Sequence, residues 1–310
     1  MKHRSRLVPA LSAVIALAGC GEDGGSTGAI QVRIEAEETI TEGLAPGGGD
    51  EAIVDGWTVA FDRYVIAIGE VHVEGGGPGD FHRDEVIAVD LARLPEGGLE
   101  VARFEGMAAG LWPEVFYATP ALTAGASRHE TVSQADFDRM VEGGCTYLIT
   151  GTITSPSGQR CPRGDGAACE SATEIAFDLC VPAPTDFGPC ESDTGIEGVT
   201  VAAGTTTTVS LTIHGDHLFF NGFPVGAESV VERRAQWLAN ADIDADGTVT
   251  REDLESIGAS ALGQLLPGYE LGGAPIPLDD AWDYVIAQLK TQGHFQGEGT
   301  CPWDGHAHAH

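Results

Sequence analysis

The spacing of apolar residues changes once along this chain, and that change limits the possible folds more than any other feature. Between residues 29 and 222, apolar side chains recur mostly at every second position, and clusters of Gly, Pro and Asp interrupt them. This alternation is typical of short β-strands. After Pro224 the apolar residues recur at the spacing of a helix. The pattern predicts an α+β fold in which a β-sandwich (29–222) precedes a small helical subdomain (223–300).

The clearest alternation lies in the last expected strand, over 205–213. Val209, Leu211 and Ile213 occupy one face, and Thr and Ser residues occupy the other, which predicts one buried and one solvated face. One helix is expected among the strands, with Ser133 as its N-cap. The other expected strands are 31–36, 57–61, 64–73, 86–91, 99–104, 146–154 and 173–179.

The helical part is expected to contain three amphipathic helices. Pro267 and Gly268 end the second helix, and Asp279 caps the third. The apolar faces are expected to be Val230, Val231, Trp237 and Leu238 in the first helix, Leu254, Ile257, Ala261 and Leu265 in the second, and Trp282, Val285, Ile286 and Leu289 in the third.

The N-terminus has the features of a secretory signal. Three basic residues precede an apolar run over 7–19, which is shorter than the roughly 20 residues that a membrane-spanning helix needs. The run ends in Leu-Ala-Gly followed by Cys20, which resembles the lipobox of bacterial lipoproteins. The resemblance implies that 1–19 is removed, that Cys20 is lipidated, that 20–28 is a flexible tether, and that the protein is anchored to the envelope, with the outer membrane as its expected location.

Net charge excludes one class of partner. The chain has 16 Lys and Arg against 47 Asp and Glu, a formal net charge of −31. Such a chain repels the phosphates of nucleic acids. The expected partners are the membrane, through the lipid on Cys20, and an envelope protein or ligand that the sequence does not identify.

Six cysteines remain once Cys20 is set aside, and an even number in an exported chain indicates disulfides. Fifteen pairings are open. The loops that lie between cysteines suggest Cys161 with Cys169 and Cys180 with Cys190. The six candidates are Cys145, Cys161, Cys169, Cys180, Cys190 and Cys301.

One acidic loop has the spacing of a calcium site. Asp242, Asp244 and Asp246 stand at alternate positions, and Gly247 follows them. Calcium binds six to eight hard oxygen atoms, and a glycine in the sixth position allows the sharp turn of such a loop. The alternating carboxylates therefore predict a calcium ion between the first two helices.

The loop resembles those of EF-hand and dockerin-type proteins, and the remaining ligands follow from that resemblance. It implies that Thr248 contributes its backbone carbonyl, Thr250 a bound water and Asp253 its carboxylate. A solitary loop with Asp at the twelfth position indicates weak binding and a structural role.

A second metal site is suggested by His214 and His217, which follow the last strand. Two imidazoles three residues apart could hold zinc or copper, with His72, His294 or the His-rich tail (301–310) completing the site. A polar turn at the end of the strand is the alternative interpretation.

No enzyme is expected, because the chain lacks the common nucleophile, phosphate-binding and zinc-protease motifs. The adjacent Glu37 and Glu38 are expected to be solvated. The layout as a whole resembles exported lipoproteins of myxobacteria, a resemblance that implies no activity. The first hypothesis is therefore a lipid-anchored, calcium-binding envelope protein with a structural or binding role. The alternative is a zinc- or copper-binding protein or metal-dependent enzyme that uses His214 and His217.

Overall fold

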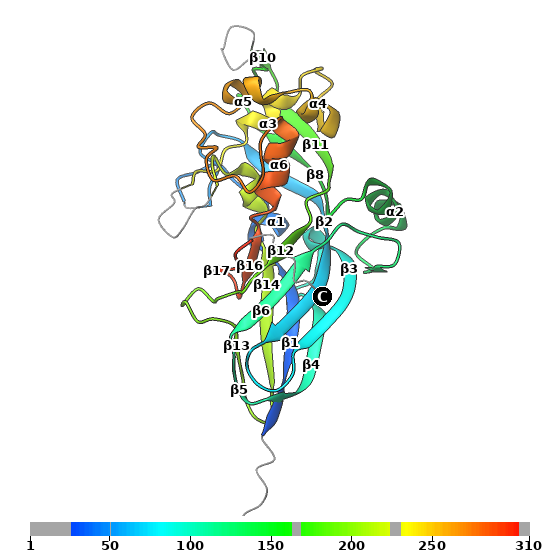
Figure 1. Ribbon diagram of the computed structural model, residues 1–310. Coiled ribbons are helices and arrows are strands. Elements are labelled where there is room, and N and C mark those ends of the chain that lie inside the picture. The colour runs from blue at the N-terminus through cyan, green and yellow to red at the C-terminus, as the bar shows by residue number, and fades with distance from the viewer. Residues whose placement is uncertain (1–25, 50, 163–168, 224–230, 304–310) are drawn as a thin grey trace, which may run out of the picture.

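The computed structural model describes residues 26–49, 51–162, 169–223 and 231–303. The fold is rich in β-structure, with 42% strand and 19% helix, and it contains three disulfides. Most strands belong to two large sheets, and the helices α3 to α6 gather at one end of the molecule (Figure 1).

The first sheet has five strands in the order β17-β16-β14-β1-β4. The pair β1 and β14 is parallel, although the two strands come from opposite halves of the chain. The other neighbours are antiparallel. The strands are β1 (Thr27–Ala36), β4 (Leu99–Ala108), β14 (Thr206–Ile213), β16 (Gly293–Phe295) and β17 (Gly299–Thr300).

The second sheet has eight strands, with the order β12-β6-β2-β8-β11-β15 and with β3 and β7 attached beside β2. Its central strand β2 is the longest in the described chain. The strands are β2 (Thr58–Glu74), β3 (Phe81–Asp90), β6 (Glu114–Thr119), β7 (Ser127–Arg128), β8 (Tyr147–Thr154), β11 (Glu174–Val181), β12 (Thr185–Phe187) and β15 (Thr248–Thr250).

Two short pairs and several helices complete the described fold. The pairs are β5 (Gly110–Trp112) with β13 (Val199–Val201), and β9 (Gln159–Arg160) with β10 (Glu170–Ser171). The helices are α1 (Glu38–Thr41), η1 (Leu91–Arg93), α2 (Gln134–Gly143), η2 (Gly215–Phe219), α3 (Gln236–Ala241), α4 (Arg251–Glu255), α5 (Ala259–Leu265) and α6 (Ala281–Leu289).

Strand β2 is buried on both faces because its alternate residues enter two different cores. Tyr64, Ile66 and Ile68 belong to the main core, whereas Val65 and Ala67 pack in a smaller core beneath α2. Successive side chains of a strand point to opposite sides, so one strand supplies both cores. This explains why the sequence of β2 is almost continuously apolar over 64–68.

The predicted strands are confirmed in position, and the expected segments 57–61 and 64–73 join into the single strand β2. The helix after Ser133 is also confirmed. The Ser133 hydroxyl accepts from the backbone N–H of Asp136, and Gly144 adopts a left-handed conformation at the C-terminal end, as expected for helix caps.

The helical segment differs from the prediction in three ways. The first helix begins at Gln236, so Val231 lies outside it. The second helix is divided into α4 and α5. The third is capped by Asp280 rather than Asp279, because the Asp280 carboxylate accepts from the backbone N–H of Asp283. The segment after residue 231 also supplies β15 to one large sheet and β16 and β17 to the other.

The disulfides confirm one suggested pair and correct the other. Cys161 bonds to Cys169, as predicted. The suggested pairing of Cys180 with Cys190 is wrong, because Cys180 bonds to Cys145 and Cys190 to Cys301. Strand β11 carries Cys180 beside β8, and Cys145 lies just before β8, so the antiparallel register brings these two together. Disulfides of this number indicate an oxidising, extracytoplasmic environment.

No helix within the described ranges is long and apolar enough to cross a bilayer.

Candidate metal centre

Three histidines meet where β14 ends beside β16 in the five-stranded sheet. His214 follows β14 directly, and His217 lies in η2. His294 is the middle residue of β16 and pairs with Thr212 of β14. The antiparallel pairing of β14 and β16 therefore brings His294 beside the two histidines that follow β14.

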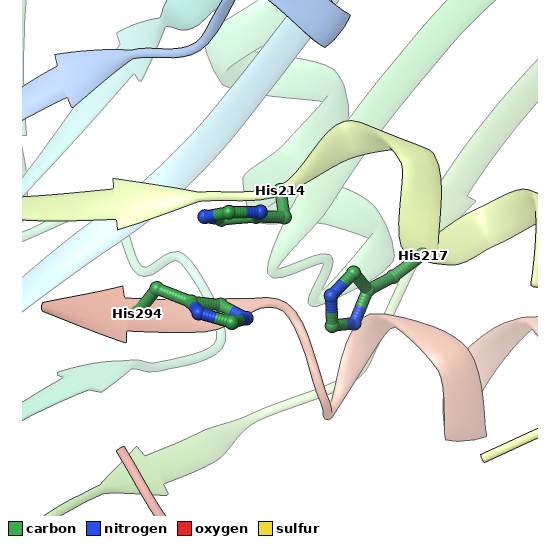
Figure 2. A group of neighbouring side chains, drawn as sticks. All are labelled: His214, His217 and His294. Atoms are coloured by element: carbon green, nitrogen blue, oxygen red, sulfur yellow. The ribbon is translucent and has the colours of Figure 1, made fainter. Parts of the chain in front are cut away.

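The three imidazoles lie next to one another, with the rings of His214 and His294 stacked and that of His217 beside them (Figure 2). One possible ligand atom from each of His214, His217 and His294 lies within 4.8 Å of the other two. The ring centroids of His214 and His294 are 3.8 Å apart, and that of His217 is 5.8 Å from the first and 5.3 Å from the second. His214 and His217 are 6% and 4% exposed, and His294 is half-buried, so two of the three rings are shielded from water.

The hydrogen bonds of His217 fix which ring nitrogen is free. The hydroxyl of Thr291 donates to the carbonyl oxygen of Gln288 at 2.8 Å, and the same hydroxyl oxygen lies 2.8 Å from Nδ1 of His217. The hydroxyl proton is already used, so Nδ1 must donate and Nε2 retains its lone pair. Burial, and then the neighbouring His294 and His214, hold the pKa of His217 well below its usual value. The ring is therefore neutral, which is the form that binds metals.

Glu37 orients His214 from the opposite side. Its Oε1 lies 2.8 Å from Nε2 of His214, and the carbonyl oxygen of Gly297 lies 3.3 Å from the same nitrogen. Both oxygens are acceptors, so Nε2 carries a proton and the neutral ring has its lone pair on Nδ1. A carboxylate behind a ligating imidazole is a common feature of metal sites, where it fixes the ring and raises its basicity.

The charge of Glu37 also changes the acidity of His214. Burial lowers the pKa of His214, but the hydrogen bond and charge of Glu37, with a contribution from Asp216, outweigh burial and raise the net pKa. Burial raises the pKa of Glu37 itself. A metal ion at Nδ1 of His214 would therefore compete with a proton for this ring.

His294, like His217, is a neutral imidazole. Burial, followed by the charge of His214, lowers its pKa to about 3. Its backbone carbonyl accepts from the hydroxyl of Tyr117 at 3.3 Å. Glu298, in the turn after β16, joins Glu37 and His214 in a second group whose ligand atoms lie within 4.8 Å of one another. In this second group Glu298 is exposed, Glu37 is half-buried and His214 is buried.

Sequence reasoning found part of this group. His214 and His217 were visible as a close pair, and His294 was one of three candidates for a further ligand. Another of these, His72, lies on β2 beside the ring of His82, with centroids 5.9 Å apart, and belongs to none of the metal-ligating groups among the described residues. The third, the tail, lies outside the described residues after position 303.

The prediction that Glu37 is solvated is wrong, because its carboxylate contacts His214 and is partly buried. No spacing links Glu37 to His214 in the sequence. Only the parallel pairing of β1 with β14, which places Ala36 opposite Ile213, brings the residues that follow the two strands together.

The acidic loop forms a third group of possible metal ligands. Asp242, Asp244 and Asp246 each place one carboxylate oxygen within 4.8 Å of the others. Gly247 has a φ of 87°, a left-handed conformation suited to the sixth position of such a loop. Its backbone N–H donates to Oδ2 of Asp242 at 3.2 Å. The residues that follow form β15, which pairs with β11, so this solitary loop gains its backbone partner from the large sheet.

Two of the remaining predicted ligands of the loop, Thr250 and Asp253, are engaged with one another. The carboxylate of Asp253 accepts from the backbone N–H of Thr250 at 2.9 Å and from its hydroxyl at 2.8 Å, forming the capping box of α4. Thr248 begins β15. Asp253 does not belong to the group of ligand atoms formed by Asp242, Asp244 and Asp246.

Arg160 is a cation beside the loop that sequence reasoning did not anticipate. Its Nη1 lies 2.7 Å from Oδ2 of Asp242, a residue that is fully buried. The other oxygen of Asp242, Oδ1, is buried and has no hydrogen-bond partner. The loop therefore contains one carboxylate oxygen that protein atoms leave unsatisfied, a state that costs free energy unless water or an ion occupies the site.

No protein-family model matches this chain, and no curated protein or solved structure matches it. Cys20, the predicted lipidation site, lies outside the described residues.

Proposed function

We propose that this protein binds a transition metal outside the cytoplasm, through His214, His217 and His294. The observation that carries the proposal is the convergence of three imidazoles, two buried and one half-buried, from the residue after β14, from η2 and from β16. Hydrogen bonds support it further, because Thr291 and Glu37 hold His217 and His214 with a free nitrogen available to a metal. A polar turn alone would not require this arrangement.

The ligand type favours zinc or copper in the divalent state. Imidazole nitrogen suits both metals. The described cysteines are joined in disulfides and supply no thiolate, which disfavours sites for monovalent copper. We propose binding rather than catalysis as the role, in keeping with the absence of nucleophile motifs in the sequence.

Metal titration of the mature protein tests this proposal. Cobalt, a spectroscopic substitute for zinc, should bind in about one equivalent to a chain truncated after residue 303, which removes the His-rich tail. His217→Ala and His294→Ala should each abolish that equivalent, whereas His72→Ala should leave it unchanged. The proposal fails if the truncated chain binds no cobalt, or if all three variants bind as the unsubstituted chain does.

We propose calcium at the acidic loop as a second, structural function. The unpartnered Oδ1 of Asp242, close to carboxylates of Asp244 and Asp246, favours this second site. Calorimetric titration with calcium should detect one weak site that Asp244→Asn removes. Heat of binding that is unchanged in this variant would contradict the assignment.

We also propose an architecture, a membrane anchor and a class of partner for this protein. We interpret the two large sheets as a β-sandwich and the segment around the acidic loop as an EF-hand-like subdomain. A lipid on Cys20 would anchor the protein to the bacterial envelope, with the outer membrane as the proposed location. Its partner would then be an envelope component, and nucleic acid is disfavoured by the net charge of −31.

A further inference from the structure

We infer that the Cys190–Cys301 disulfide completes the metal centre, so that the protein reaches its full metal affinity only after this bond has formed. The inference rests on the proposed imidazole site and names a condition for its assembly. His294 is supplied by the very short strand β16, whereas the other two histidines follow β14.

Strand β16 has only three residues, Gly293–Phe295. It pairs with β14 along its length, and it pairs on the other side with the two residues of β17. A two-stranded hairpin of this size is not stable by itself. The position of His294 therefore depends on β14 on one side and, on the other, on what holds β17 in place.

The far end of the hairpin is fixed to the segment around Cys190. Cys301 follows β17 directly and bonds to Cys190. Glu191 donates its backbone N–H to the carbonyl of Thr300 at 2.9 Å, and Gly188 donates to the carbonyl of Pro302 at 2.9 Å. The disulfide is the covalent part of this attachment, and the two hydrogen bonds flank it.

The turn of the hairpin contacts the site directly. The carbonyl oxygen of Gly297 accepts from the hydroxyl of Thr212 at 2.8 Å and lies 3.3 Å from Nε2 of His214. Gln296 has a φ of 52°, a left-handed conformation that is unfavourable for residues with a Cβ atom. The turn thus adopts its shape through contacts with the rest of the protein, and loosening the hairpin would disturb both His294 and the surroundings of His214.

The other two disulfides serve as internal controls. Cys145–Cys180 joins β8 to β11 in the other sheet, and Cys161–Cys169 closes the loop between β9 and β10. Neither bond involves an element that carries a histidine of the group. Their removal should affect stability without a specific effect on the metal site.

The Cys190–Cys301 disulfide is buried, so it affects the site during folding rather than by reversible reduction afterwards. Cys190 and Cys301 are 0% and 3% exposed, so a reductant has little access to the bond in the folded protein. The dependence therefore concerns maturation: oxidation precedes tight metal binding. Formation of the bond removes two electrons and two protons from the thiols, and an external disulfide such as oxidised glutathione accepts them and becomes two thiols.

The first test compares cobalt affinity among disulfide variants of the full mature chain. Cys190→Ala with Cys301→Val, which retains an apolar filling, should bind cobalt at least about tenfold more weakly than the unsubstituted chain. Cys145→Ala with Cys180→Ala, and Cys161→Ala with Cys169→Ala, should each stay within about twofold. Circular dichroism checks that each variant is folded. An unsubstituted chain that binds no cobalt defeats the proposed function, whereas a folded Cys190/Cys301 variant with unchanged affinity overturns this inference alone.

A second measurement applies if that variant does not fold. The reduced, unfolded natural chain is refolded with oxidised glutathione, samples are blocked with iodoacetamide at intervals, and peptide mapping identifies the disulfides present. After excess reagent is removed, cobalt binding should rise in parallel with the Cys190–Cys301 bond. Full binding in species that lack this bond would overturn the inference.

Discussion

At the scale of single residues, Glu37 is predicted to strengthen the metal site without itself being required as a ligand. Its carboxylate lies 2.8 Å from His214 and holds that ring with Nδ1 free. Loss of such a partner typically weakens metal binding by about 10- to 100-fold. Glu37→Gln retains the size of the side chain and an acceptor oxygen but removes the charge, so a loss near the lower end, about tenfold, is expected in a cobalt titration.

Glu38 provides a matched control for that substitution. It is the next residue in the chain and is exposed. Glu38→Gln removes the same charge from nearly the same place and should leave cobalt affinity within about twofold. Equal losses of cobalt affinity in the two variants would mean that Glu37 acts only through long-range charge. Unchanged affinity in both variants would mean that Glu37 does not support the metal site.

The buried imidazoles also predict how the metal-free protein responds to pH. The pKa of His217 is well below its usual value, and that of His294 is lowered to about 3. In the unfolded chain both bind protons near pH 6.5. Below about pH 6.5 the unfolded state therefore binds protons that the folded state does not bind. The free energy of unfolding decreases as the pH falls, by at most about 1.4 kcal/mol per pH unit for each ring.

His214 works in the opposite direction, because its pKa is raised in the folded protein. Its contribution is complete below about pH 6.5 and is lost as the pH rises through its folded pKa. Urea unfolding of the metal-free chain at pH 7.5 and pH 5.5 measures the combined contribution of the three histidines to the free energy of unfolding. His217→Gln should reduce the loss of stability between these pH values, and an undiminished loss in that variant would show that His217 does not contribute.

The histidine group marks the limit of prediction from sequence at this scale. His214 and His217 were recognisable because their spacing alone places them together. Glu37, Thr291 and Glu298 were not recognised, because the pairing of β1, β14 and β16 rather than any local pattern brings them to the site.

At the scale of elements, the acidic loop and its neighbour β9 are predicted to depend on each other. Arg160 of β9 neutralises the fully buried Asp242, with Nη1 and Oδ2 2.7 Å apart. Removing one partner of a buried ion pair typically costs about 3–5 kcal/mol. Arg160→Met should therefore destabilise the calcium-free protein by about 3 kcal/mol in urea unfolding, and saturating calcium should restore much of that loss, since the ion supplies the missing positive charge.

An exposed ion pair gives the comparison for this effect. Arg83 and Glu85 are both well exposed, and such pairs contribute about 0–1 kcal/mol. Arg83→Met should change stability little, with or without calcium. If calcium stabilises Arg160→Met no more than it stabilises the unsubstituted chain, then the ion does not act at Asp242.

The sequence predicts the positions of some helices and strands but not how the strands pair. Alternation predicted the long strands β1, β2, β3, β4, β8, β11 and β14, because each of these has a buried face, and Ser133 marked the start of α2. Strand β6 and the short strands were not predicted, and two of the short ones, β7 and β10, have only exposed residues. The first predicted helix began too early, since Val231 has the right spacing but lies in an irregular segment that pairs with other parts of the fold through Arg233. Strand pairing was beyond prediction, and with it the link between Cys145 and Cys180, which depends on the register of β8 and β11.

At the scale of the whole molecule, the lipobox-like sequence predicts where the protein resides. Cys20→Ser should abolish incorporation of labelled fatty acid and move the protein from the detergent phase to the aqueous phase in a detergent partition experiment. Cys190→Ser provides a control, because it removes a cysteine that belongs to the folded body. Unchanged lipid labelling in Cys20→Ser would contradict the proposed anchor.

The two proposed metal sites are predicted to stabilise the molecule independently. The imidazoles belong to η2, to the residue between β14 and η2, and to β16, the aspartates follow α3, and the two groups share no residue. A ligand at 100 times its Kd stabilises a protein by about 2.7 kcal/mol, and the effects of sites that do not interact add to within about 0.5 kcal/mol. Zinc and calcium together, each at 100 times its Kd, should therefore stabilise the chain by about 5.4 kcal/mol in urea unfolding. Because both large sheets share one core, a sum clearly above this value would mean that one ion orders the core for the other, and a sum near 2.7 kcal/mol would mean that the two ions compete for one site.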